Sequence, residues 1–168
     1  SQYKQKSIDI TLCEQVIELT AKLNHSAALV NLPLPRFGRR RMLYELNHSV
    51  AWLVRQHLKM SLSTNEEQQL SEEFHRLIDI INQQAYYPQH RDLHSKNIMV
   101  LSTKELAVID FQDAFIGPAS YDLASLTRDC YLRWPQECIE QGCRYYRQLA
   151  MDIGLLDKNL SYDEFIMQ

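Results

Sequence analysis

The feature that most constrains this chain is a pair of short apolar runs on either side of a polar turn. Residues 98–101 read Ile-Met-Val-Leu and residues 106–109 read Leu-Ala-Val-Ile, with Ser-Thr-Lys at 102–104 between them. This pattern predicts a β-hairpin. A hairpin returns the chain to the end at which it began. Asp110, which follows the second run, is therefore expected beside Asn97, which precedes the first.

Polar residues of a particular kind stand at both ends of this hairpin. The segment before it reads His90-Arg91-Asp92-Leu93-His94-Ser95-Lys96-Asn97, and the segment after it reads Asp110-Phe111-Gln112-Asp113. The first has the spacing H-R-D-x-x-x-x-N of the phosphoryl-transfer site in the kinase template. In that template the Asp receives the proton of an acceptor hydroxyl and the Asn holds magnesium. Carboxylate and amide oxygens suit this hard cation. We predict that Asp92 is catalytic and that Asn97 and Asp110 bind Mg²⁺ and the phosphates of ATP.

Length and composition suit one globular domain without a nucleic-acid or membrane partner. The 168 residues are 45% hydrophobic and 23% charged, which are ordinary values, and the net charge is only −3. No apolar run approaches the roughly 20 residues that cross a bilayer. The cysteines lack the spacing of a zinc site and suggest reduced thiols. They are Cys13, Cys130, Cys138 and Cys143. We therefore expect a cytoplasmic protein.

Most of the remaining chain has the periodicity of helices. Thr11 with Glu14, and Thr64 with Glu67, have the spacing of capping boxes that start helices. Gly117-Pro118 predicts a turn after the hairpin. Further helices are expected from about 40 to 59, from 121, from 135 to 154 and from 161.

The helix expected near residues 40–59 carries both a predicted core and two open questions. Its apolar residues recur at helical spacing and are expected to point inward. They are Leu43, Leu46, Val50, Leu53 and Leu58. Glu45 and Trp52 on the same helix could face a cleft, but a solvated carboxylate and a packed indole are favoured.

Parts of the kinase template are missing from this chain. The template needs a glycine-rich loop over the phosphates, a strand lysine and a helix glutamate. The four glycines lie far apart in the sequence, and everything before His90 reads as helix and loop. We therefore predict that residues 1–168 form the C-terminal catalytic lobe of a small-molecule kinase, mainly α with a small β-hairpin. We expect the nucleotide-binding lobe to be absent from residues 1–168, and the helix that begins at 161 to be cut short. A lobe of this kind exposes an interface, so self-association is expected.

These motifs resemble those of the aminoglycoside phosphotransferase family, the small-molecule branch of the protein-kinase-like fold. That family commonly reads His-x-Asp-Leu-His-x-x-Asn followed by Ile-Asp-Phe, as this chain does at 90–97 and 109–111. His94 and Gln112 stand where protein kinases usually have Lys and Gly, which favours a small acceptor over a peptide. Softer downstream patterns at 110–114, 117–118, 121–123 and 128–131 are similar to a bacterial branch. That branch phosphorylates the anomeric hydroxyl of N-acetylmuramate and N-acetylglucosamine.

The resemblance implies an ATP-dependent phosphotransferase whose acceptor is an amino sugar. It implies that His90 supports the loop and that Asp113 and Arg128 are candidate substrate contacts, although Asp113 could instead lie behind the residues that touch the acceptor. At the start of the helix expected from 121, Ser120 or Asp122 could be the cap, and for Asp122 a structural cap is favoured over a ligand. A polycationic aminoglycoside would need surplus carboxylates around the pocket. Asp113 and Asp129 are offset by cationic neighbours, which fits a neutral or anionic sugar better. Those neighbours are Arg91, Lys96 and Arg128.

Two alternatives remain open at this point. The acceptor could be an aminoglycoside or another small alcohol. The chain could also be a non-catalytic pseudokinase or an interaction module. The intact triplet Asp92, Asn97 and Asp110 counts against the latter, because a module released from catalysis has no physical need to keep these residues together.

Overall fold

The structure is a computed structural model that describes residues 10–30, 32–101 and 105–167. The chain divides into two compact units. The first comprises residues 1–36 and 85–168, and the second comprises residues 37–84. None of the described helices combines the length and the apolar character that a bilayer span requires.

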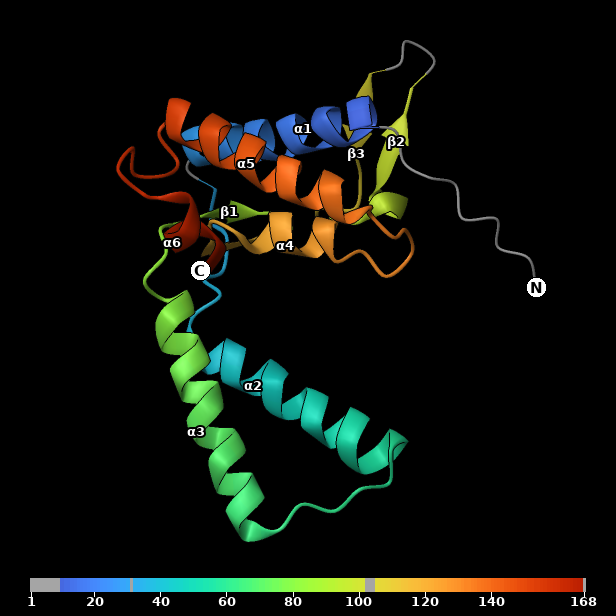
Figure 1. The fold of residues 1–168 in the computed structure, drawn as a ribbon, viewed down its shortest axis with the longest axis vertical. Helices are drawn as coiled ribbons and strands as arrows, with labels where there is room; N and C mark the ends of the chain where they lie inside the picture. Colours follow the sequence, from blue (N-terminus) through green and yellow to red (C-terminus); the bar gives the residue numbers. More distant parts are fainter. Residues whose placement is uncertain (1–9, 31, 102–104, 168) are drawn as a thin grey trace, which may run out of the picture. The chain divides into compact units, whose positions relative to one another are not determined.

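The first unit is built on two long helices that pack along each other (Figure 1). They are α1, Ile10–Leu29, and α5, Gln136–Asp152. The short helices α4, Tyr121–Thr127, and α6, Tyr162–Met167, complete the same core. Ile17 of α1 and Tyr146 of α5 are almost completely buried there. The prediction of helices at these places is confirmed, and Gly154, with a positive φ of 81°, lies just beyond the end of α5.

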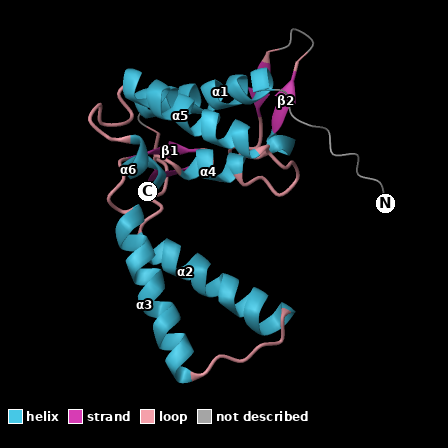
Figure 2. Cartoon of the chain, viewed as in Figure 1, coloured by secondary structure: helices cyan, strands magenta, loops and turns pink. Residues whose placement is uncertain are grey.

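Two pairs of antiparallel strands lie in the segment that precedes α4 (Figure 2). Strands β2, Ile98–Val100, and β3, Leu106–Val108, form the predicted hairpin, with Ile98 opposite Val108. Its predicted turn at 102–104 lies outside the described residues. Strands β1, Tyr86–Gln89, and β4, Phe115–Pro118, pair with Gln89 opposite Phe115. The pairing of β1 with β4 therefore fastens together the two ends of the segment that carries the hairpin.

The β1–β4 pair corrects two predictions. Residues 86–89 form a strand where only helix and loop were expected, and Gly117-Pro118 lies in a strand and not in a turn. Both strands are four residues long and each contains a proline, so neither has an alternating pattern that sequence could reveal. Their pairing joins residues about thirty positions apart, for example Tyr87 with Gly117, and is a tertiary contact.

The second unit contains α2, Arg39–Ser49, which continues as a π-helix, η1, Val50–His57, and then α3, Thr64–Ile81. Ser63 and Glu66 form the capping box of α3, one residue before the predicted pair. The predicted capping box of α1 is wrong because that helix already begins at Ile10. The half-buried carboxylate of Glu45 pairs with Arg41 one turn away.

The inward face predicted for residues 43–58 is only partly correct. Leu53 and Leu58 are 55% and 52% exposed, and Trp52 is 62% exposed, so the packed indole is also wrong. A π-helix bonds each residue to the fifth along the chain, so side chains spaced for an α-helix no longer share one face. The α-helical spacing assumed in the prediction therefore does not hold over Val50–His57.

Candidate active site

Asp92 and Asn97 lie together because the chain between them makes a tight turn. Residues Ser95–Asn97 form a single 3₁₀ turn, η2, directly before β2. The Asn97 amide nitrogen donates to the Asp92 backbone carbonyl at 2.8 Å and lies 3.3 Å from the Asp92 carboxylate. Asn97 is only 7% exposed, whereas the Asp92 side chain is 54% exposed. The turn thus buries the amide and presents the carboxylate to solvent.

Asp110 is placed by bonds to the residue before it. The Ile109 backbone N–H donates to the Asn97 carbonyl at 3.0 Å, and the Ile109 carbonyl accepts from His90 Nε2 at 2.9 Å. Ile109 is therefore held on both sides. The predicted juxtaposition of the two hairpin ends is present in the backbone, and Asp110 emerges next to the segment that carries Asn97.

Two residues of this loop adopt backbone conformations that ordinary side chains avoid. Arg91 has φ 77° and Asp110 has φ 72°, both in the left-handed region. Such a conformation costs about 1–3 kcal/mol per residue and persists only where the surroundings enforce it. Here the enforcing contacts are the bonds to Ile109 and a bond to the Arg91 N–H. Backbone strain of this kind is concentrated at functional sites.

His90 lies beneath the loop and not at its surface. It is 3% exposed, and because a carbonyl oxygen can only accept, Nε2 must carry the proton that bonds Ile109. Its Nδ1 is buried with no hydrogen-bond partner among the described residues. These contacts connect the start of the segment at 90–97 to Asp110.

Asp122 anchors the same loop, a contact that sequence reasoning missed. Its carboxylate accepts from the His90 N–H at 2.7 Å and from the Arg91 N–H at 3.0 Å. The side chain is completely buried in the first turn of α4. Burial raises the pKa of Asp122, while the hydrogen bonds from His90, Asn24 and Arg91 act in the opposite direction. The expected structural cap is therefore a loop anchor, and an Asp among apolar residues at 119–126 was the available signal.

A second carboxylate holds the far side of the loop. Asp129 accepts from the Ser95 N–H and from the Tyr131 N–H, each at 2.7 Å. Burial acts to raise the pKa of Asp129, but hydrogen bonds from Ser95, Tyr131 and Leu132 outweigh it and lower the pKa. Tyr131 in turn contacts the loop, with the His94 ring edge-on at 4.9 Å and Lys96 Nζ 3.8 Å from its ring centre. Asp129 is thus committed to loop structure.

The two candidate substrate contacts lie in different places. Asp113 is 62% exposed and its carboxylate lies 3.5 Å from the Arg91 guanidinium, so it belongs to the surface around the loop. Arg128 lines a pocket of about 480 Å³ between α4, α5 and α6, together with Arg144 and Tyr162. The lining of that pocket includes no residue of 90–97 or 109–113. The structure therefore groups Asp113, but not Arg128, with the loop.

An Asp followed five residues later by an Asn, with a second Asp after the next hairpin, matches the arrangement of the catalytic Asp, the Asn and the metal-binding Asp in kinase-like phosphotransferases. Residues 3–154 match the model of the phosphotransferase enzyme family, APH. The match covers most of the chain, and the chain belongs to this family. The resemblance noted from its motifs is confirmed.

Three curated relatives carry one name, N-acetylmuramate/N-acetylglucosamine kinase. The protein from Neisseria meningitidis serogroup B is 34% identical over 79% of this chain and 39% of its own length. The protein from Pseudomonas putida is 29% identical over 82% of this chain and 40% of its own length. The protein from Pseudomonas aeruginosa is 29% identical over 73% of this chain and 36% of its own length. The chain thus spans about two fifths of the relatives that it matches.

A solved structure supports the fold. The crystal structure of aminoglycoside-3'-phosphotransferase of type VIII is similar, with a TM-score of 0.53 and 17% sequence identity. The similarity covers 97% of this chain and 61% of that protein. It confirms the predicted fold class, mainly α with a small β-hairpin in a protein-kinase-like fold, to which the structure adds the antiparallel pair β1–β4.

Proposed function

We propose that this chain is the C-terminal catalytic lobe of an ATP-dependent kinase that phosphorylates a hydroxyl group of an amino sugar. The observation that carries the proposal is the local geometry at 90–110, where one loop and one hairpin bring together Asp92, Asn97 and Asp110. The names of the three relatives support the amino sugar. A reaction that consumes ATP would take place in the cytoplasm.

Asp92 is the proposed catalytic residue. Its exposed carboxylate would orient the acceptor hydroxyl and take its proton as the oxygen attacks the γ-phosphorus of ATP. A new bond then forms between the acceptor oxygen and phosphorus, and the bond from the γ-phosphorus to the bridging oxygen breaks to release ADP. The Asn97 amide, 3.3 Å away, keeps the Asp92 carboxylate in place.

Asn97 and Asp110 are the proposed ligands of Mg²⁺. The Asn97 amide nitrogen is used by the Asp92 carbonyl, which leaves Oδ1 as the Asn97 atom that can face a cation. Asp110 supplies an exposed carboxylate at the adjacent hairpin end. An amide oxygen and a carboxylate are suitable ligands for a hard cation that carries phosphates, so the donor set fits. Bound Mg²⁺ would neutralise negative charge on the phosphates.

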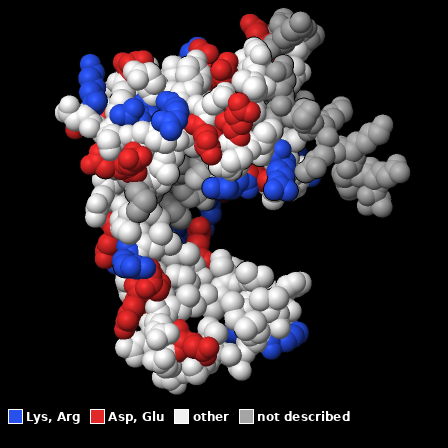
Figure 3. Space-filling view, in the orientation of Figure 1, with Lys and Arg blue, Asp and Glu red and all other residues white. Residues whose placement is uncertain are grey.

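The charges around the loop favour a sugar over a polycation. Asp129 is engaged by backbone N–H groups and Asp113 faces Arg91, so neither is a free carboxylate for an ammonium group. On the face shown in Figure 3, acidic and basic side chains alternate over the first unit and neither sign dominates. Desolvating several ammonium groups would be costly in such surroundings.

A parallel assay of the complete gene product tests the proposal. The acceptors are N-acetylmuramate, N-acetylglucosamine and kanamycin, with Mg²⁺ and ATP. We expect turnover of the amino sugars and little turnover of kanamycin. Preferred turnover of kanamycin would overturn the sugar assignment but not the kinase assignment. No turnover of any acceptor, with intact folding, would favour a non-catalytic module.

A further inference from the structure

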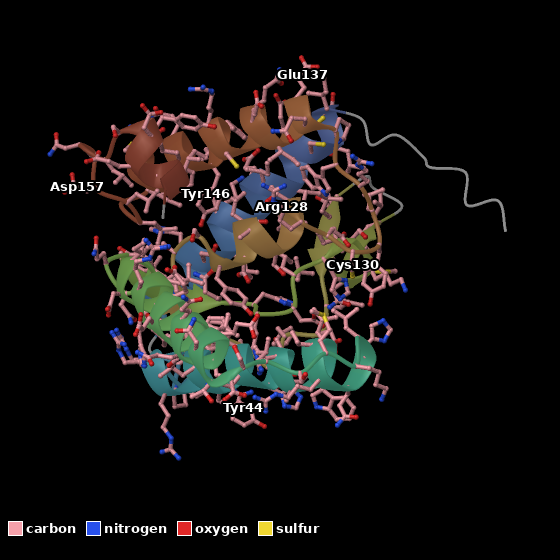
Figure 4. The ribbon with its side chains drawn as sticks, turned by 60° about the horizontal axis from the view of Figure 1, so that its bottom comes forward. Tyr44, Arg128, Cys130, Glu137, Tyr146 and Asp157 are labelled. Atoms are coloured by element: carbon pink, nitrogen blue, oxygen red, sulfur yellow. The ribbon has the colours of Figure 1, made fainter. Side chains whose placement is uncertain are left out.

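A chain of buried polar side chains connects Asp122 to both long helices of the core. Asn24 of α1 donates from Nδ2 to the Asp122 carboxylate at 3.1 Å and to the Pro88 carbonyl at 2.9 Å. Asn24 Oδ1 lies 3.2 Å from the hydroxyl of Tyr146 of α5, which also lies 3.0 Å from the Ala119 carbonyl. Tyr146, labelled in Figure 4, and Asn24 are each 1% exposed. We call these three side chains, Asn24, Asp122 and Tyr146, the anchor network.

The bonding of the anchor network leaves a single orientation for the Asn24 amide. Its nitrogen faces two acceptors and its oxygen faces a hydroxyl, so a flipped amide would oppose like partners. The network joins positions 64, 98 and 122 residues apart in the chain. The single hydroxyl proton of Tyr146 is shared between two acceptors, Asn24 Oδ1 and the Ala119 carbonyl. Satisfied buried networks make local structure rigid and unique.

Stability alone does not explain polar atoms at this place. Apolar side chains of similar volume would fill the same core without the cost of desolvating an amide, a carboxylate and a phenol. The burial of Asp122 raises its pKa, which reflects that cost. Polar side chains, unlike apolar ones, fix the orientation of their partners through hydrogen bonds. Asn24 fixes one oxygen of Asp122, and the same carboxylate fixes the two N–H groups that precede Asp92.

We propose that Asn24 and Tyr146 are positioning residues for the catalytic loop. They orient the Asp122 carboxylate, which holds the His90 and Arg91 N–H groups and so determines where the Asp92 carboxylate lies. Arg91, with its left-handed backbone, is the residue through which the network acts. This inference rests on the proposed function, because a positioned Asp92 matters only if Asp92 acts in the reaction.

The test compares shape-conserving substitutions with a matched control. Tyr146→Phe removes only the hydroxyl, at nearly constant volume. Asn24→Leu removes both polar atoms and keeps the branched shape of the side chain, although its two methyl groups are larger than the amide atoms. Thr20→Val is the control because Thr20 lies one turn from Asn24, is also 1% exposed, and donates its hydroxyl to Val16 of its own helix. All three changes remove buried polar groups from the same core.

Two readouts separate positioning from stability. In the complete gene product we expect kcat to fall about ten-fold or more in Asn24→Leu and about three-fold or more in Tyr146→Phe, since small misplacements of a catalytic group are costly. KM for both substrates should change less than about two-fold, and Thr20→Val should keep kcat within about two-fold. In the 168-residue chain, the His90 and Arg91 amides should exchange their hydrogens faster in Asn24→Leu than in Thr20→Val.

Each outcome decides the proposal. Unchanged kcat in folded Asn24→Leu and Tyr146→Phe, or a loss matched by Thr20→Val, would overturn it. If Asn24→Leu does not fold, Tyr146→Phe decides, and failure of both beside a folded Thr20→Val would assign the network to stability alone. An inactive wild-type protein would overturn the proposed function instead, and amide exchange would still report whether the anchor network holds the loop.

Discussion

Asp92 and Asp110 are carboxylates of one short segment, yet they are held in place in different ways. Asp92 lies within 3.3 Å of His94 Nε2 and of the Asn97 amide, so its direction is controlled by side chains. Asp110 is exposed and is placed through its own backbone, by φ 72° and by the bonds to Ile109. This difference fits the proposed roles of Asp92 as the base and of Asp110 as a ligand of Mg²⁺.

Replacing each carboxylate should therefore have a distinct kinetic effect in the complete protein. We expect Asp92→Ala to lower kcat by roughly 10²–10⁴-fold, the range for loss of a positioned general base. Asp110→Ala should lower kcat and also raise the Mg²⁺ and ATP concentrations needed for half-maximal rate. Steady-state kinetics with varied Mg²⁺ measure both. Glu137→Ala, at an exposed carboxylate on α5 (Figure 4), is the control. An Asp92→Ala protein within a few-fold of wild type would show that Asp92 is not the base.

At the scale of elements, the close approach of α1 and α5 positions the core beneath the loop. Gly142 of α5 faces Ile17 of α1, and a Cβ at position 142 would lie 2.3 Å from Ile17 Cδ1. Ile17 is completely buried, so its side chain has little room to move away. The glycine is therefore explained by a packing contact and not by backbone conformation.

Gly142→Ala should destabilise the chain although alanine is the better helix former by about 1 kcal/mol. We expect a net loss of roughly 1–3 kcal/mol from overpacking. Ile17→Val removes Cδ1, the atom that clashes, and should itself cost about 0.5–1.5 kcal/mol. The double variant should be at least as stable as Ile17→Val. Denaturant unfolding of the four proteins measures the coupling, and additive losses would refute the contact.

At the scale of the whole molecule, apolar side chains gather on the hairpin that carries the candidate site. Phe111 is 70% exposed and Val100 is 62% exposed. Met99, Leu101 and Ile109 are each 45–48% exposed. Exposed apolar groups that lie close together tend to find partners. This surface supports the proposal that residues 1–168 are one lobe of a larger kinase.

The first consequence of the proposal that residues 1–168 are one lobe concerns activity. We expect the 168-residue chain to show no measurable kinase turnover, because catalysis in this class consists mostly of positioning and charge stabilisation around a clamped nucleotide. The complete gene product, assayed beside it with ATP and an amino sugar, is the positive control. Ordinary turnover by the short chain would refute its assignment as one lobe.

The second consequence concerns association. We expect the 168-residue chain to dimerise or aggregate at tens of micromolar, because the exposed hairpin surface gains from burial. Sedimentation velocity across a concentration series measures this. Val100→Ser and Phe111→Ser should reduce association, whereas Lys158→Ser, at an exposed lysine between α5 and α6, should not. A monomer at every concentration would contradict the expectation.

Part of this protein's structure could be predicted from its sequence, because that part depends on local contacts. The hairpin of β2 and β3, the helices α4 to α6 and the juxtaposition of Asn97 with Asp110 depend on neighbours within about twenty positions. Periodicity and spacing record contacts at that range. The motif and the fold class followed from them.

Other features were decided by the tertiary structure alone. The β1–β4 pair, the bonds of Asp122 to His90 and Arg91, and the contact of Asn24 with Asp122 join residues that are roughly 30 to 100 positions apart. A buried Asp or Asn looks in sequence like any solvated one, because only the folded chain determines which donors surround it. Helical periodicity likewise records neither the change from α-helix to π-helix at Val50 nor the exposure of Trp52.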